Sequence, residues 1–228
     1  MLAFPSAPVS PKVFFEETVP ALFLEAGVGP EDRERVGQLK FGVVLIAGEE
    51  GKNEGGQWTL QIIDGELVVL IGRCADCDLT IVQDVADWRS ALWEGRPRLI
   101  ADGIEVLASA APAALLERRE SIDRAHPEAL KGLSDLQGLI EAVIAEEEPG
   151  SGGADWRIGI HLGRGPIPES PQATIRLGAE QAEAIRDGGL HPVEALITGQ
   201  LRLEGDLGLI LQLQAVAMLV MMPPPTSG

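Results

Sequence analysis

Residues 195–206 read Ala-Leu-Ile-Thr-Gly-Gln-Leu-Arg-Leu-Glu-Gly-Asp, and residues 91–102 read Ala-Leu-Trp-Glu-Gly-Arg-Pro-Arg-Leu-Ile-Ala-Asp. The two stretches begin 104 residues apart (195 minus 91), and Ala, Leu, Gly, Arg, Leu and Asp recur in register. A repeat at a fixed offset is the sequence signature of a duplicated structural unit. The match therefore predicts that the chain contains two units of like topology.

Two further blocks lie upstream and keep the same order in both halves. A Gly-Gly pair precedes a tryptophan at Trp58 and again at Trp156, and a Thr-Ile pair follows at Thr80-Ile81 and at 174–175. Three blocks in one order are much harder to obtain by chance than one. The repeat therefore extends over most of each half.

Each half also shows the same order of expected elements. An amphipathic helical region comes first, and a strand, a Trp-led strand, a turn into a third strand and a short Thr-Ile strand follow. A helix, a short strand and a terminal helix end each half, which gives an α+β class. The expected ranges are 13–38 and 112–136 for the helical regions, 41–47 and 139–146 for the first strands, and 58–63 and 156–162 for the Trp-led strands.

Length and composition agree with two small domains. The 228 residues suffice for two units of about 100 residues each, and we expect domain 1 at residues 12–111, domain 2 at 112–222, and tails at 1–11 and 223–228. Aromatic residues are only 4% of the chain, so the cores are expected to be built from Leu, Ile, Val and Ala.

Charge and hydropathy exclude several partners. The net charge of −17 is spread over both halves and repels phosphate backbones, so nucleic acid is not expected as a partner. The longest uncharged apolar run, residues 207–222, has 16 residues and is shorter than the ~20 needed to span a bilayer, so no stable membrane insertion is expected. The first residues do not resemble a secretory signal, which favours a cytoplasmic location.

The blocks resemble the sterol carrier protein 2 (SCP2) family, whose pattern is a Trp-containing strand, a Thr-Ile strand, a Gly-Asp strand–turn and a Leu-rich last helix. The second half matches best, through Trp156, residues 173–175 and residues 196–214. The first half matches through Trp58, residues 75–81, Gly95 and Asp102. The resemblance implies tandem SCP2-like domains, each a mostly antiparallel five-stranded sheet covered by helices.

The family binds sterols, fatty acids, fatty acyl-CoA or phospholipids in an apolar tunnel, so the resemblance implies non-covalent binding or transfer of a lipid-like ligand without a cofactor. The first half has Pro97 in its late strand and Pro112 in its last helix, and lacks about ten residues of helical wall, so we expect its tunnel to be reduced or absent. The family's usual basic strand near the ligand mouth is reduced here to Arg202 alone. The residues expected to line the tunnel are Ile158, Ile160, Ile175, Leu209, Leu213, Val216 and Met218.

Alternatives remain open at this stage. The last helix, 206–220, is apolar almost all round, which also fits a plain core, a domain interface or membrane docking. The chain could instead be a non-catalytic scaffold or accessory module with filled cores, with a protein partner or a second copy. An enzyme acting on an apolar substrate is disfavoured because no catalytic constellation stands out.

Two cysteines and two histidines complete the candidates. Cys74 and Cys77 form a C-x-x-C outside any βαβ context, which favours a structural role over a regulatory disulfide or a metal site. No metal site is expected. His161 alternates with Ile160 and Leu162 along a strand, so it is expected on the opposite face, at the surface. His191, before Pro192, is expected to begin a helix.

Overall fold

The computed structural model describes residues 4–25, 40–47, 54–63, 66–97, 136–145 and 155–212. The strands are β1 (Lys40–Ile46), β2 (Gly56–Ile63), β3 (Glu66–Ile71), β4 (Leu79–Asp84), β5 (Gly138–Ala145), β6 (Trp156–Leu162), β7 (Ala173–Gly178) and β8 (Leu201–Gly205). The helices are α1 (Pro11–Val13), α2 (Val19–Glu25), α4 (Val85–Arg89), α8 (Ala179–Arg186) and α9 (Pro192–Ile197), with π-helical turns η1 (Phe14–Thr18) and η2 (Ser90–Glu94). Residues 207–212 are also helical.

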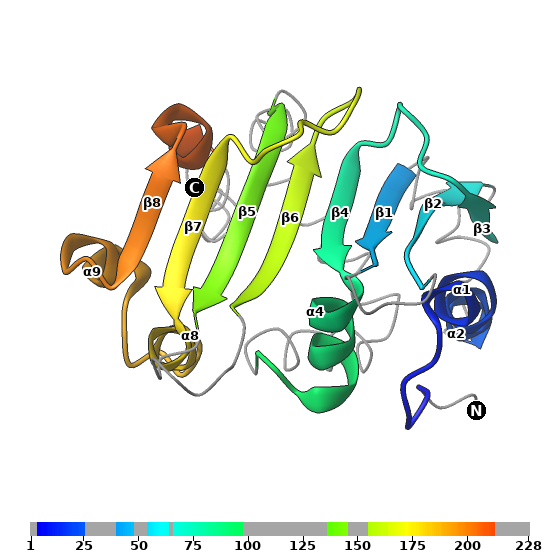
Figure 1. Cartoon of the computed structure of the whole chain (residues 1–228), viewed down its shortest axis with the longest axis horizontal. Coiled ribbons are helices and arrows are strands. Elements are labelled where there is room, and N and C mark those ends of the chain that lie inside the picture. Colours follow the sequence, from blue (N-terminus) through cyan, green and yellow to red (C-terminus); the bar gives the residue numbers. More distant parts are fainter. Residues whose placement is uncertain are drawn as a thin grey trace, which may run out of the picture.

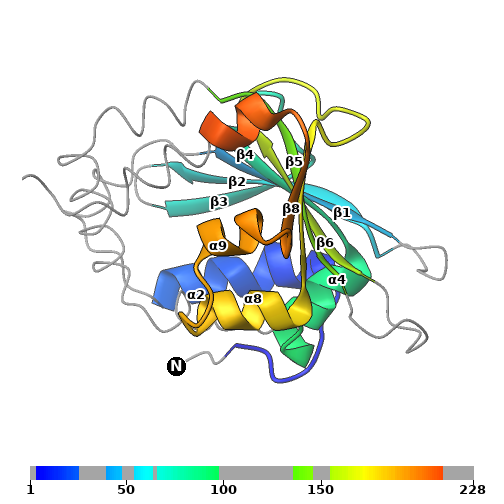
Figure 2. The same cartoon turned by 90° about the vertical axis from the view of Figure 1, so that its left-hand side faces the viewer.

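The described strands form one twisted mixed sheet of eight strands in the order β3-β2-β1-β4-β6-β5-β7-β8 (Figure 1). Figure 2 shows α2, α4, α8 and α9 gathered on one side of this sheet. We call that side the helix face. The protein is thus an α+β structure, in which a sheet is packed under helices.

Three strands and the helix that follows them repeat in the two halves. β1 pairs antiparallel with β2 and parallel with β4, after which α4 follows directly. β5 pairs in the same way with β6 and β7, after which α8 follows. Trp58 and Trp156 lie on β2 and β6, the second strands of the two equivalent hairpins. The two tryptophans therefore occupy equivalent strands.

The expectation of two separate, mostly antiparallel five-stranded sheets is wrong. β4 pairs antiparallel with β6, from Leu79 opposite Leu162 to Val82 opposite Gly159, so the halves share one sheet. Unpaired strand edges leave main-chain hydrogen-bonding groups open, and this pairing satisfies those of both strands. The expected domain boundary at 111–112 and the helical region 112–136 lie outside the described residues, and the tandem-domain arrangement stays a prediction.

The third strand expected in the second half is absent. Residues 163–172 connect β6 to β7 without strand structure, whereas β3 occupies the corresponding place in the first half. Pro166, Pro168 and Pro171 fall in this connection. Proline has no N–H to donate to a strand ladder, so three of them in six residues prevent a further strand.

The core of the first half is aromatic rather than aliphatic. Phe15 stacks on Trp58 with ring centroids 4.9 Å apart, and Phe14 meets Trp88 edge to face at 5.3 Å. The cluster is formed by Phe14, Phe15, Val43, Leu45, Trp58, Val85 and Trp88, with Phe4 and Trp93 packed against it. The few aromatic residues of the chain are therefore concentrated under β1 and β2.

The helices after β7 begin and end where the sequence indicates. Gly188, with φ +73°, follows α8. His191 precedes α9, and its Nδ1 accepts a hydrogen bond from the Val193 N–H at 3.2 Å, with Pro192 as the first helical residue. The prediction for His191 is confirmed.

Candidate functional site

The second half presents a continuous apolar surface on the helix face of the sheet. Residues opposite one another in register share a face, so Ile160 lies in a row with Ile140 and Ala173, and Ile158 lies in the next row with Ala142 and Ile175. Sequence alternation therefore directs these expected ligand-lining residues to one side. The structure brings Ile158, Ile160 and Ile175 together on β6 and β7.

The helix at 207–212 covers one end of this surface. Leu209 and Ile210 are buried and pack in a cluster with Ile140, Leu162 and Ala173, against which Ile160 and Ile175 also pack. Ile158 belongs to the neighbouring cluster around Trp156, which includes Ala182 of α8. Three of the seven predicted residues thus lie on this sheet surface, and Leu209 covers one end of it. Leu213, Val216 and Met218 lie outside the described residues.

Exposure separates the predicted residues into two kinds. Leu209 is only 6% exposed and belongs to the core. Ile158, Ile160 and Ile175 are half-buried, although they lie on the helix face. Half-buried isoleucines keep apolar surface with which an apolar ligand could make contact.

The Gly205-Asp206 pair of the repeat places the 207–212 helix. Gly205 has φ +86°, and a Cβ on it would lie 2.2 Å from the main-chain oxygen of Gln172. Asp206 donates its N–H to that same oxygen at 2.8 Å, and its carboxylate accepts a hydrogen bond from the Leu209 N–H at 3.1 Å. A glycine and an N-capping aspartate are therefore required here, because the chain turns against Gln172 and starts a helix at once.

Gln172 is a positioning residue that the sequence analysis missed. Its side-chain Oε1 accepts a hydrogen bond from the Leu139 N–H at 3.2 Å, and its own N–H donates to the Leu139 oxygen at 2.8 Å. It therefore joins β5, β7 and the helix that carries Leu209. Its place two residues before the Thr174-Ile175 pair is the signal that could have identified it.

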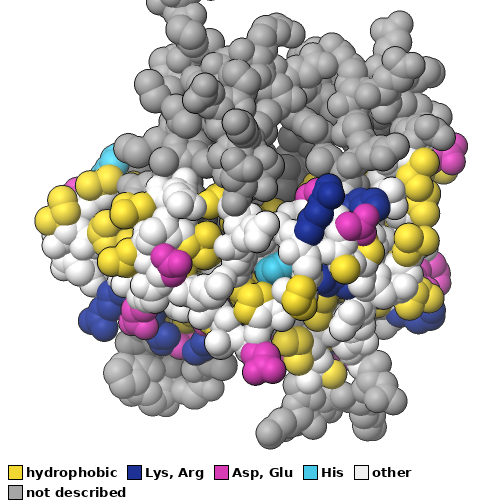
Figure 3. Space-filling view, turned by 90° about the horizontal axis from the view of Figure 1, so that it is seen from above, with side chains coloured by type: hydrophobic (Ala, Val, Ile, Leu, Met, Phe, Trp, Pro, Cys, Tyr) yellow, Lys and Arg dark blue, Asp and Glu magenta, His cyan; other side chains and the backbone are white. Residues whose placement is uncertain are grey.

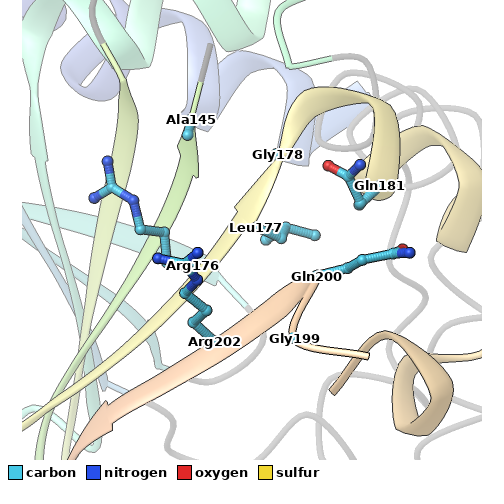
Figure 4. A pocket seen from close by; sticks show the side chains of 8 residues that line it. All are labelled: Ala145, Arg176, Leu177, Gly178, Gln181, Gly199, Gln200 and Arg202. Carbon is cyan, nitrogen blue, oxygen red and sulfur yellow. The ribbon is translucent and has the colours of Figure 1, made fainter. Parts of the chain in front are cut away.

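A small pocket lies at the end of β7, and its lining includes Leu177 from the helix face as well as Arg176 and Arg202 from the other face. Its volume is about 260 Å³, and Figure 4 shows Arg176 and Arg202 extending from neighbouring strands, whereas Gln181 and Gln200 lie with Leu177 on the other side of β7. Arg176 and Arg202 are opposite in register, and Arg176 forms an ion pair with Asp155. Since Arg176 follows Ile175 directly along β7, the two guanidinium groups and the apolar surface lie on opposite faces.

The expectation that His161 lies at the surface is wrong. It does point away from the helix face, but it is only 3% exposed. Its Nδ1 lies 3.2 Å from Nη2 of Arg73, which also donates to Thr80 Oγ1 at 2.8 Å and to the Gly165 oxygen at 2.9 Å. Burial, and then the charge of Arg73, lower the pKa of His161. The buried imidazole thus packs beside the partly buried guanidinium of Arg73.

The two cysteines lie in contact in the turn between β3 and β4. Their sulfur atoms are 3.0 Å apart, and both are free thiols. Within the described ranges, no group of three or more His, Cys, Asp or Glu side chains is placed to hold a metal ion. Likewise, no helix in the described part of the chain has the length and apolar character needed to cross a membrane.

Comparison with known protein families finds a match in the second half of the chain. Residues 119–218 match the SCP-2 sterol transfer family. The matched region contains β5–β8 and the apolar surface. No curated protein matches the chain.

Several solved structures are similar to part of the chain. Palmitated sterol carrier protein 2-like 2 from Aedes aegypti is 23% identical, with 44% of this chain and 92% of that chain covered and a TM-score of 0.28. Sterol carrier protein domain 2 of Helicoverpa armigera is 17% identical, with 47% and 87% covered and a TM-score of 0.31. Apo sterol carrier protein 2 from Yarrowia lipolytica is 13% identical, with 42% and 90% covered and a TM-score of 0.27. We infer no individual feature of this chain from structures at these TM-scores.

Proposed function

We propose that the second half binds a lipid-like ligand non-covalently on the apolar surface formed by Ile158, Ile160 and Ile175, with Leu209 at one end. The observation that carries the proposal is the set of half-buried isoleucines on one face of β6 and β7, inside the region that matches the SCP-2 sterol transfer family. Leu213, Val216 and Met218 are proposed to complete the lining. The role is binding or transfer, without catalysis.

The length and apolar character of the surface support an alkyl chain or a sterol as its ligand. From Ala173 to Leu177, β7 advances four residues, or roughly 13 Å at ~3.3 Å per residue. Burial of apolar surface contributes roughly 25 cal/mol per Å² and is not directional. Such a surface selects a ligand by length and shape, so the ligand class is broad: a sterol, a fatty acid or a fatty acyl-CoA.

The first half is a poorer candidate for the same role. The helix face of β1 and β2 is occupied by the aromatic cluster around Phe15 and Trp58, in which rings meet at contact distance. Close packing of this kind leaves no space for a ligand. We therefore place the ligand in the second half.

The test is native mass spectrometry of the full chain after purification under mild conditions. We expect a species whose mass exceeds that of the chain by one lipid, which organic extraction removes and a fatty acid restores. A fluorescent fatty acid added to the extracted protein should then bind and be displaced by an unlabelled one. Absence of both co-purified lipid and fatty-acid binding would overturn the proposal.

A second candidate function is an interaction module. Apolar side chains of α9 and of the 207–212 helix face solvent, with Ile197 81%, Leu211 60% and Leu207 53% exposed. Figure 3 shows hydrophobic side chains gathered at the left-hand end of the molecule, where α9 and β8 lie in Figure 1. Exposed apolar patches mark interaction surfaces. The test is whether the chain self-associates and whether Ile197→Ser reduces this association without removing fatty-acid binding. If both are observed, the interaction role is favoured.

A further inference from the structure

The C-x-x-C turn brings two thiols of unequal exposure into contact. Cys74 and Cys77 flank a tight turn between β3 and β4, with Sγ atoms 3.0 Å apart. A disulfide requires an S–S distance of about 2.05 Å, so the sulfur atoms need to approach by about 1 Å. Side-chain rotation in a turn can supply this movement without a change in the strands.

The two sulfur atoms are suited to different steps of an exchange reaction. Cys74 is partly exposed, so a reagent in solution can reach it. Cys77 is 0% exposed, and burial raises the pKa of its thiol to about 11. Cys77 is therefore protected from solution reagents and reacts only with a group that is already at Cys74.

The turn is also part of the contact between the two halves. The Ala75 oxygen accepts a hydrogen bond from the Gly165 N–H at 2.7 Å, and the Asp78 oxygen accepts one from the Gly163 N–H at 3.1 Å. Gly163 and Gly165 belong to the connection between β6 and β7 in the second half. A change in the C-x-x-C turn therefore acts directly on this connection.

We propose that Cys74 and Cys77 form a reversible dithiol–disulfide site that stiffens the contact between the two halves when it is oxidised. With a small disulfide such as oxidised glutathione, the Cys74 thiolate attacks one sulfur, a mixed disulfide forms, and the first glutathione thiolate leaves. The Cys77 thiolate then attacks the Cys74 sulfur, and the second glutathione leaves. Two cysteine thiols are oxidised, one disulfide is reduced to two thiols, and the two thiol protons pass through solvent to the two glutathione molecules.

The ring closed by this disulfide contains only four residues, so its effect on the unfolded chain is small. The expected consequence is local. Oxidation should restrict the turn that holds the Gly163 and Gly165 amides, and should slow their hydrogen exchange.

The experiment equilibrates the full chain in glutathione buffers from fully reducing to fully oxidising, quenches with acid, and alkylates free thiols before intact mass analysis. We expect both alkylatable thiols to disappear together, at the monomer mass and without a glutathione adduct. In Cys77→Ser, a glutathione adduct should accumulate at Cys74. In Cys74→Ser, which keeps only the buried thiol, the adduct should form far more slowly.

Three outcomes would overturn the proposal. In one, both thiols remain alkylatable in the fully oxidising buffer. In another, the oxidised wild type carries glutathione or becomes a covalent dimer. In the third, hydrogen exchange at residues 163–165 is the same in the oxidised and reduced proteins, which removes the link to the contact between the halves.

Discussion

The guanidinium of Arg73 lies 3.2 Å from Nδ1 of His161, and the two residues come from opposite halves of the chain. Arg73 follows β3 and His161 lies on β6, so the contact crosses the β4–β6 pairing. Because the arginine also donates to Thr80 Oγ1 and to the Gly165 oxygen, its charge is well satisfied although it is partly buried. This polar cluster supports the junction of the halves on the face opposite the helices.

The buried His161 predicts a loss of stability in mild acid. Its folded-state pKa is below its ordinary value, mainly because of burial and then because of Arg73, so the unfolded chain binds a proton more readily. Its contribution to stability is complete above pH ~6.5, the pKa of an unperturbed histidine, and is lost as the pH falls below it. Denaturant titrations at about pH 7.5 and about pH 5 should show a smaller free energy of unfolding at the lower pH.

The matched variant is His161→Gln, in which an uncharged amide can still accept from Arg73. The loss of stability between the two pH values should be smaller in this variant than in the wild type. The pKa of Asp87 is raised by burial and has the opposite effect on the pH dependence, but it is present in both proteins and cancels in the comparison. An equal loss in both proteins would mean that His161 does not couple folding to pH.

Gly205 should be the more sensitive of two glycines with similar backbone conformation. Gly205 and Gly199 have φ of +86° and +74°, but a Cβ at Gly199 meets nothing within 4 Å, whereas one at Gly205 meets the Gln172 oxygen. Gly199→Ala should cost about 1 kcal/mol from the left-handed backbone alone. Gly205→Ala should cost a further 1–3 kcal/mol or so from the clash. Equal losses in urea unfolding would show that the close approach to Gln172 carries no energy.

Both halves should unfold in one transition. They share the β4–β6 ladder, the Trp156 indole N–H donates to the Asp87 oxygen at 2.9 Å, and the Arg157 N–H donates to the Asp87 carboxylate at 3.0 Å. These contacts join α4 of the first half to β6 of the second. Far-UV circular dichroism and tryptophan fluorescence should therefore give coincident urea curves. Two separated transitions would show that the halves are independent domains, despite their common sheet.

The features that were predicted correctly are those that local interactions determine. Strand positions, the entry of α9 at His191-Pro192 and the repeated strand order depend on periodicity and caps, which a sequence displays. The pairing of β4 with β6 depends on contacts about 80 residues apart, and no local pattern encodes it. The burial of His161 was missed for the same reason. Alternation along a strand predicts the face on which a residue lies, but not which other residues cover that face.

The candidate site was predictable in part for a related reason. Alternation along β6 and β7 is enough to place Ile158, Ile160 and Ile175 on one face, and the Gly-Asp block is enough to place Leu209 near them. The aromatic filling of the first half was not foreseen, because composition gives the number of aromatic residues but not their concentration in one cluster. Arg202 was expected near the ligand mouth, but β8 places it on the opposite face from Ile175, beside Arg176.

The location of ligand binding can be tested with one substitution in each half. Leu60 and Ile160 lie on β2 and β6, the equivalent strands of the two halves, and both are half-buried on the helix face. Ile160→Trp should fill the proposed surface and lower the affinity for a fluorescent fatty acid at least tenfold, at a cost of roughly 1–3 kcal/mol in stability.

Leu60→Trp is the control, because it adds the same volume on the equivalent strand of the half whose core is aromatic. It should cost a similar amount of stability and leave the fatty-acid affinity within about twofold, and circular dichroism would establish that both variants are folded. If Leu60→Trp abolishes binding and Ile160→Trp does not, the ligand lies in the first half. If a folded Ile160→Trp binds as tightly as the wild type, the apolar surface of β6 and β7 is core packing and the ligand-binding role assigned to it is wrong.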